Sequence, residues 1–192
     1  MHPTEIEAVL KTLVLLVDTR EQPTAQAQER LKRTELPVQR EKLNFGDYSG
    51  AVTINGELVN FSDRFAIERK MSLDELAACY THDRKRFEKE FERAKEAGAK
   101  LYLLIENGSI DKVIQGTYRS RFTPKAFLAS LTAWLARYNC QIVMCSAENS
   151  GRLIKEIVYR EVKERLINEE RWGLIMRISD RKVSEEIKEY FS

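Results

Sequence analysis

The sequence predicts an α/β fold in which a mixed central sheet is flanked by helices. Apolar strands alternate with amphipathic helices along the chain, a pattern typical of strand–helix–strand units. The runs at 13–17 and 101–105 are continuously apolar, as expected of strands buried on both faces. The chain has 192 residues, of which 43% are hydrophobic and 32% charged. That is enough for one domain with a sizeable core.

The first half of the chain is expected to hold most of the strands. In order, the sequence predicts strands at 13–17, 38–47, 51–54 and 65–70, with a helix-compatible connector at 24–33. Asn55-Gly56 is a hairpin turn signal, because both residues tolerate positive φ. Ser72 and Glu75 have the spacing of a capping box, so a helix should begin there.

The second half is expected to be richer in helix. The predicted elements are a helix at 83–97 ending before Gly98, a strand at 101–105, a helix opened by Thr123-Pro124, a strand at 141–145 and a long helix striped by residues 153–162. The pattern weakens after Asn168. We therefore expect one domain over residues 1–168 and a charged C-terminal tail or small helical appendage over 169–192.

Composition narrows the function classes. The net charge is only +2, so a nucleic-acid partner would need a local basic surface. The three cysteines form no C-x-x-C pair, and with two histidines they match no familiar zinc spacing. No apolar stretch reaches the length of a membrane span, and the start lacks the basic region of a secretory signal. A cytoplasmic protein is expected.

A cluster of charges ends the predicted strand at 65–70. The apolar run Phe65-Ala66-Ile67 leads directly into Glu68, Arg69 and Lys70, and Asp74 follows. Burying an unpaired charge is costly, so a divalent metal and a phosphodiester are the expected partners. Alternate side chains of a strand share a face. Glu68 and Lys70 should therefore point one way and Arg69 the other.

A carboxylate and an ammonium two residues apart on one strand suit phosphodiester hydrolysis. Carboxylate oxygens hold Mg²⁺ or Mn²⁺, which polarises the phosphate and acidifies water. The ammonium of Lys70 can orient that water or neutralise developing charge. Asp47 follows a glycine and ends a predicted strand, so it is the expected second carboxylate. Asp47 followed by Glu68-x-Lys70 fits the D…(D/E)-x-K arrangement of restriction-endonuclease-like folds.

Three segments in order resemble the nuclease domain of XPF-type structure-specific endonucleases. They are Val17-Asp18-Thr19-Arg20-Glu21, Gly46-Asp47 and Glu68-Arg69-Lys70-Met71-Ser72-Leu73-Asp74. They match the family's V-D-x-R-E, G-D and E-R-K-x-x-x-D motifs, and the resemblance covers residues 12 to 165. It implies a restriction-endonuclease-like core, dependence on Mg²⁺ or Mn²⁺, and cleavage of branched, flapped or otherwise non-duplex DNA.

The resemblance also implies roles for single residues. Asp18, Asp47 and Glu68 would be metal-associated carboxylates, and Lys70 the catalytic lysine. Arg69 and Asp74 complete the catalytic signature, with Arg69 pairing with an acid or contacting phosphate. Arg20 and Glu21 would be supporting residues. The sequence carries no helicase segment and no recognisable helix-hairpin-helix module, so branched DNA would be recognised by the nuclease domain, the tail or a partner.

Arginines are the candidate DNA contacts. The family places an arginine after the signature, and Arg84 or Arg86 could fill that role. Periodicity favours Arg84, which shares a helical stripe with Phe87. Arg119 and Arg121 alternate with aromatic residues on a predicted loop, which can bind phosphate and stack bases; loop packing is the commoner explanation. Late helices of the family can bury a dimer interface, so a homodimer is a further expectation.

The sequence therefore predicts a metal-dependent DNA endonuclease that prefers branched, flap or fork DNA. A second hypothesis is a less structure-selective DNase of a phage or mobile element, since no helix-hairpin-helix module is recognised. A third is a non-catalytic DNA-binding partner subunit. The intact acids of the signature argue against that one.

Overall fold

The computed structural model describes residues 3–168, which form seven helices and seven strands. The helices are α1 (Pro3–Leu10), α2 (Ala25–Thr34), α3 (Leu73–Thr81), α4 (Arg84–Glu96), α5 (Ile110–Gln115), α6 (Pro124–Arg137) and α7 (Ser150–Ile167). The strands are β1 (Val14–Asp18), β2 (Val38–Glu41), β3 (Tyr48–Ile54), β4 (Glu57–Asn60), β5 (Phe65–Lys70), β6 (Lys100–Glu106) and β7 (Cys140–Cys145).

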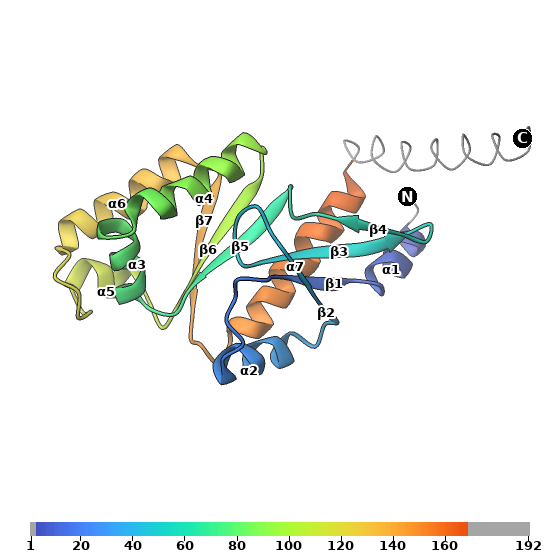
Figure 1. Ribbon diagram of the computed structural model, residues 1–192, viewed down its shortest axis with the longest axis horizontal. Helices are drawn as coiled ribbons and strands as arrows, with labels where there is room; N and C mark the ends of the chain where they lie inside the picture. The colour runs from blue at the N-terminus through green and yellow to red at the C-terminus, as the bar shows by residue number, and fades with distance from the viewer. Residues whose placement is uncertain (1–2, 169–192) are drawn as a thin grey trace, which may run out of the picture.

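The strands form a single mixed sheet in the order β2-β1-β3-β5-β6-β7, with β4 paired to β3 (Figure 1). β5, β6 and β7 are parallel to one another, and β3 is antiparallel to β1, β4 and β5. The predicted mixed α/β architecture is therefore confirmed. The carboxyl ends of β5, β6 and β7 meet at one edge, where ligands of such sheets usually bind.

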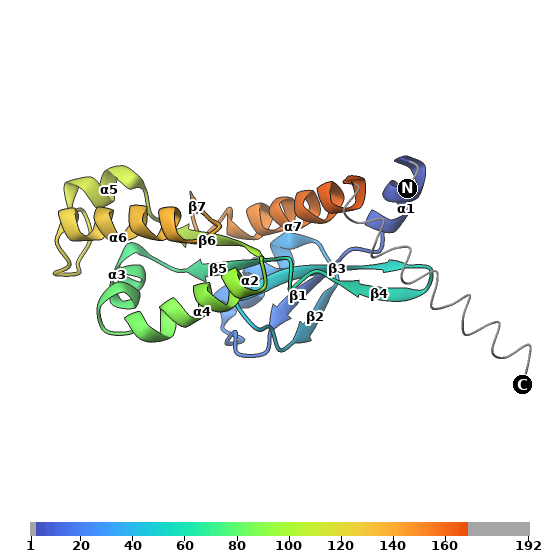
Figure 2. The same ribbon diagram turned by 90° about the horizontal axis from the view of Figure 1, so that it is seen from above.

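The sheet separates two hydrophobic cores. Along β6, Leu101, Leu103 and Ile105 pack into one core with α3, α4 and α6, and we call this side the α4 face. Tyr102 and Leu104 pack into the other core with α1 and α7, on the side we call the α7 face. Figure 2 shows α7 running along its face of the sheet. Strand alternation thus divides buried side chains between two layers of helices.

Several local signals form as predicted. The Ser72 hydroxyl accepts a hydrogen bond from the Glu75 amide, and Glu75 reaches back to the amide of Met71, which closes the capping box. Asn55 and Gly56 have φ of 53° and 81° and join β3 to β4. Positive φ at both positions is the signature of the two-residue hairpin turn.

The predicted strand at 38–47 is wrong in its second half. β2 ends at Glu41, and β3 begins at Tyr48. Gly46 has φ of +71°, which an extended strand does not allow. Leu43 and Phe45 are buried from a loop, so their alternation imitates a strand. Asp47 therefore precedes a strand, whereas the sequence placed it at a strand end.

The expected tail at 169–192 lies outside the described residues. Among residues 3–168, no helix is long and apolar enough to cross a membrane.

Candidate active site

Gly46 lets the loop before β3 approach β5 closely. A Cβ at this position would lie 2.7 Å from the Cβ of Ala66 and 3.2 Å from the carbonyl oxygen of Ile67. The next residue, Asp47, donates its amide to the Ile67 carbonyl at 2.8 Å and accepts the Asp18 amide on its own carbonyl at 2.8 Å. Asp47 is thereby fixed between β1 and β5.

The carboxylate of Asp47 points to the end of β5. Its Oδ2 accepts a hydrogen bond from the backbone amide of Arg69 at 2.8 Å. Arg69 lies between Glu68 and Lys70, so this hydrogen bond ties Asp47 to the end of β5 that carries both of those side chains.

Glu68 and Lys70 share the α4 face of β5, and their side chains pair with Lys70 Nζ 2.6 Å from Glu68 Oε1. Glu68 is 6% exposed. The ammonium of Lys70 also lies 5.0 Å from the centre of the Phe87 ring, a cation–π contact. The predicted alternation is confirmed, because Arg69 points to the α7 face and pairs there with Glu21 and Glu106.

A pocket of about 430 Å³ opens over these groups, between β5, the loop before β3 and α4. Its walls carry both signs of charge. The lining residues are Arg20, Gln22, Gly46, Asp47, Glu68, Lys70, Glu75, Cys79, Asp83, Arg86, Phe87 and Glu90.

Two of the carboxyl groups that line the pocket, those of Asp47 and Glu68, have raised pKa values. Burial raises the pKa of Asp47 well above its ordinary value, and the nearby negative charge of Glu68 raises it further. Burial also raises the pKa of Glu68, although the Lys70 ammonium opposes that rise. Burial alone would lower the pKa of Lys70, but the charge of Glu68 raises it, so the lysine stays protonated. A further cation beside the two carboxylates would relieve their repulsion.

The donor set fits a hard divalent cation. Asp47 Oδ1 and Glu68 Oε2 accept no hydrogen bond from residues 3–168, so each acid keeps an oxygen for a ligand. Within the same residues, no three His, Cys, Asp or Glu side chains form a complete metal cage. One or two carboxylates, completed by waters and substrate phosphate, are the usual protein ligands of Mg²⁺.

Asp18 is placed differently from the other two predicted metal carboxylates. Its Oδ1 accepts the amide and Nε of Arg20 at 2.8 and 2.6 Å, and its Oδ2 accepts the Leu43 amide at 2.7 Å. Burial would raise the pKa of Asp18, but these hydrogen bonds lower it below its ordinary value. Asp18 does not line the pocket, whereas Arg20 does. Asp18 thus holds Arg20 at the pocket edge, and its role as a metal ligand stays a prediction.

Of the two candidate arginines on α4, Arg86 lines the pocket and Arg84 does not. Arg84 lies 5.4 Å from the Trp134 ring, while Arg86 lines the pocket. Phe87 and Phe91 direct one stripe of α4 into the core. The neighbouring stripe, which carries Arg86, faces the pocket, so Arg86 is the arginine placed beside the acids.

Asp74 lies away from the pocket and holds a loop. Its Oδ1 accepts the amides of Arg119 and Ser120 at 2.8 and 2.7 Å. Burial would raise the pKa of Asp74, but the hydrogen bonds from Ser120 and Arg119 lower it. The side chain of Arg119 is 92% exposed, and Arg121 is exposed as well. Asp74 thus fixes the loop that presents these two arginines.

Replacing Asp74 with Ala should free this loop. We expect trypsin to cleave after Arg119 and Arg121 several-fold faster, since three hydrogen bonds are lost. Limited proteolysis followed by mass spectrometry measures the rates. Asp111→Ala, on the exposed start of α5, is the control. Equal cleavage rates in both variants would contradict the clamp.

Sequence reasoning missed Glu90. Its Oε2 accepts the amide of Gly46 at 3.2 Å, and its Oε1 pairs with Arg93 at 2.8 Å. The negative charge of Glu90 also contributes to the raised pKa of Glu68. The signal for Glu90 in the sequence is its spacing from Asp83 and Arg86, which places the three residues along one side of α4. The same spacing occurs on ordinary solvated helix faces, so it does not single out Glu90.

Comparisons with known proteins agree with this architecture. A family model described as the ERCC4 domain matches residues 17–157. A structure of XPF from Aeropyrum pernix is similar with a TM-score of 0.55 and 19% identity, over 77% of this chain and 61% of that one. The chain thus matches less than two thirds of that structure. XPF from Aeropyrum pernix in complex with DNA is similar with a TM-score of 0.56 and 22% identity, over 93% and 81%. No curated protein matches the chain.

Proposed function

We propose, because this chain belongs to the ERCC4 domain family, that it cleaves DNA phosphodiesters with Mg²⁺ or Mn²⁺ and prefers branched, flap or fork DNA. Two predictions from the sequence are confirmed: the chain resembles XPF-type nuclease domains, and its core has the restriction-endonuclease-like fold. The observation that carries the proposal is the pocket in which Asp47, Glu68 and Lys70 meet.

In the proposed site, Asp47 and Glu68 would hold the cation through their carboxylate groups. When bound, such an ion withdraws electron density from the scissile phosphate and makes a neighbouring water more acidic. Lys70, held beside Glu68, donates hydrogen bonds to the water or to the developing charge on phosphate. The backbone amide of Arg69 keeps the Asp47 carboxylate directed to the site.

Basic side chains around the pocket suit a phosphate backbone. Arg20 and Arg86 line the pocket itself, and their charges can neutralise phosphates beside the cleaved bond. Arg119 and Arg121 lie on the loop held by Asp74. In our proposal they contact DNA beyond the pocket. The cytoplasmic location and the homodimer stay predictions.

The direct test is a cleavage assay on defined DNA. Purified protein is incubated with labelled flap, fork, single-stranded and linear duplex DNA in Mn²⁺ or Mg²⁺, and products are separated on denaturing gels. We expect cleavage that needs the metal and is faster on flap and fork DNA than on linear duplex.

Each other outcome decides against a part of the proposal. Equal rates on fork and duplex DNA favour the less selective DNase. Tight binding of branched DNA with no cleavage in either metal favours a non-catalytic partner subunit. No binding and no cleavage of any of these substrates contradicts the proposed function.

Metal binding should depend on pH because the two acids must ionise. The folded chain holds protons at Asp47 and Glu68 more tightly than the unfolded chain does, so their contribution to the free energy of unfolding falls as pH rises. A cation reverses this trend by favouring the ionised groups. We expect Mn²⁺ affinity, measured by calorimetry, to rise between about pH 5 and about pH 8. Constant affinity over this interval would contradict the assignment of these ligands.

A further inference from the structure

A buried network of polar side chains lies behind β5, on the α7 face. Its members are Glu21, Arg30, Tyr48, Arg69 and Glu106, and we call it the back network. Tyr48 is 0%, Glu106 2% and Arg30 6% exposed. Charged residues are rarely buried this deeply unless they are paired. The family resemblance gave a role to Glu21 and Arg69, but none to Arg30 or Glu106.

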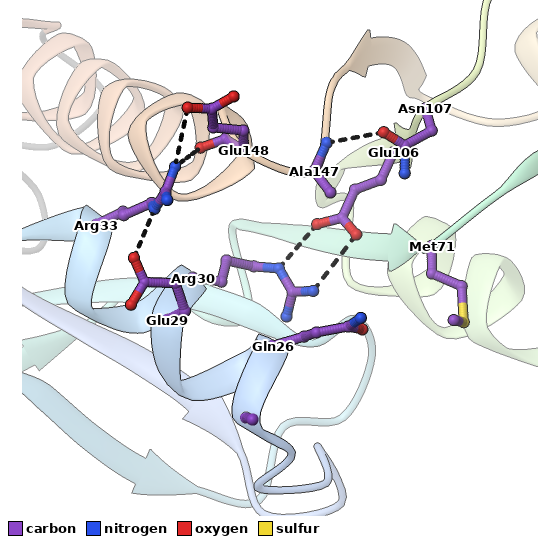
Figure 3. A pocket seen from close by; sticks show the side chains of 10 residues that line it. Gln26, Glu29, Arg30, Arg33, Met71, Glu106, Asn107, Ala147 and Glu148 are labelled. Atoms are coloured by element: carbon purple, nitrogen blue, oxygen red, sulfur yellow. Dashed lines mark hydrogen bonds and ion pairs between the residues drawn. The ribbon is translucent and has the colours of Figure 1, made fainter.

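Arg30 and Glu106 form the centre of the back network. Arg30 Nε lies 2.8 Å from Glu106 Oε1, and Arg30 Nη2 lies 3.4 Å from Glu106 Oε2. Figure 3 shows the guanidinium of Arg30 facing the carboxylate of Glu106 in this two-pronged contact. Glu106 Oε2 also accepts Arg69 Nη1 at 3.4 Å. One carboxylate at the end of β6 therefore ties α2 to β5.

Glu21 is the second acceptor of the network. Its Oε1 accepts the Tyr48 hydroxyl at 2.9 Å, and the guanidinium groups of Arg30 and Arg69 approach it to 3.4 Å. Two arginines and two glutamates thus neutralise one another where water is largely excluded. Hydrogen bonds among buried charges make such a network rigid, although one buried donor, Arg69 Nε, has no hydrogen-bond partner within residues 3–168.

The back network holds the residue that directly follows each of the two acids Asp47 and Glu68. Arg69 lies between Glu68 and Lys70, and its backbone amide donates to Asp47 Oδ2. Tyr48 follows Asp47 directly and pairs with Ile67 on β5. Fixing the side chains of Arg69 and Tyr48 on the α7 face therefore fixes the backbone that presents Asp47 and Glu68.

We propose that Arg30 and Glu106 are positioning residues for the active site, an inference that rests on the proposed function. They act through Arg69: Glu106 pairs with the Arg69 side chain, Arg30 holds Glu106, and the Arg69 amide orients Asp47. Neither residue lines the pocket over Asp47; both line a separate pocket of about 460 Å³ (Figure 3). Groups that orient metal ligands typically change metal affinity or activity by about 10- to 100-fold when they are mutated.

The experiment compares Glu106, at the end of β6, with Glu161 of α7, which pairs with the start of β6. Glu106→Gln removes the charge that anchors Arg30 and Arg69. Glu161→Gln is the matched control, because Glu161 binds Lys100, at the start of β6, at 2.8 Å and Tyr102 at 2.7 Å in a half-buried cluster on the same face. Both variants lose a buried or half-buried ion pair, but only Glu106 contacts Arg69.

We expect Glu106→Gln to lower kcat by about 10- to 100-fold and to raise the half-saturating Mn²⁺ concentration, while DNA affinity without metal changes less than about twofold. In metal-free protein, the amide of Arg69 should exchange with solvent faster than in the wild type. Glu161→Gln should leave kcat, the Mn²⁺ requirement and this exchange rate unchanged, although it lowers the melting temperature.

A double variant separates positioning from simple stability. Removing one partner leaves a buried charge unpaired, whereas replacing both with apolar residues restores stability in many proteins. We therefore expect Arg30→Met/Glu106→Leu to melt near the wild type and still to lose activity, because Arg69 has lost one of its two acidic partners and keeps only Glu21. Recovery of kcat and amide protection in the double variant would overturn the inference.

Cleavage by the wild type and amide exchange at Arg69 distinguish a failure of this inference from a failure of the proposed function. If the wild type cleaves no DNA, the proposed function fails. Amide exchange at Arg69 still reports whether Arg30 and Glu106 hold the peptide. If the wild type cleaves DNA but Glu106→Gln behaves as Glu161→Gln does, the function stands and the positioning role is overturned.

Discussion

Asp47→Asn should abolish DNA cleavage while leaving the fold intact. Asparagine keeps the size of the side chain and an oxygen that accepts the Arg69 amide. It lacks the negative charge that the proposed site uses to hold the cation. Metal-assisted stabilisation of the transition state amounts to several kcal/mol, so we expect a loss of at least about 10³-fold in kcat. Single-turnover cleavage of a flap substrate in Mn²⁺ measures it.

Stability should move in the opposite direction from activity in this variant. Because burial and Glu68 raise the pKa of Asp47, its ionised form destabilises the metal-free fold. The melting temperature of Asp47→Asn at neutral pH should therefore equal or exceed that of the wild type. Asp63→Asn, on an exposed acid paired with Arg64, is the control and should cleave normally. Full activity of Asp47→Asn would refute the proposed centre.

Lys70→Met should also cause a large loss, by a different route. Methionine retains an apolar chain over the Phe87 ring but removes the ammonium that pairs with Glu68. We expect kcat to fall by about 10²- to 10³-fold, since a group that stabilises developing charge is lost. KM for DNA should change little, because the lysine lies inside the pocket. Steady-state kinetics on flap DNA separates the two parameters.

A lysine on a similar ring serves as the control for this variant. Lys95 lies 5.8 Å from the centre of the Tyr138 ring and is exposed on α4. Lys95→Met should keep wild-type kinetics. A variant of Lys70 that retains kcat and loses only DNA affinity would show that the ammonium acts as a binding charge alone.

The sequence predicts the local parts of the site well. The alternation of β5 separates Glu68 and Lys70 from Arg69, and the capping box starts α3 at the predicted place. Both features depend on neighbours within a few residues, so a single stretch of sequence carries them. The two buried runs that became β1 and β6 were also evident, because strands covered on both faces contain apolar residues without interruption.

Most of the parts that needed the structure depend on contacts between segments that are distant in the sequence. The sequence does not show that the Asp18 carboxylate accepts hydrogen bonds from Arg20 and from the distant amide of Leu43. Periodicity favours Arg84 because it gives the stripe of a helix, but it does not give the position of the pocket, which Arg86 lines. Glu106 follows an apolar run just as Glu68 does, so the argument that a buried charge needs a partner applies to it as well. The sequence does not show that its partners are Arg30 and Arg69.

The hydrogen bonds of Asp47 have a consequence for when the chain gains activity. Its backbone joins Asp18 of β1 to Ile67 of β5, and its carboxylate meets the amide of Arg69. These contacts join segments far apart in sequence, which form late in folding. A chain that has made only its helices and the β3–β4 hairpin holds the acids apart. In the proposed nuclease, newly made or partly unfolded chains therefore lack an assembled active site, and DNA is cleaved only once the sheet is complete.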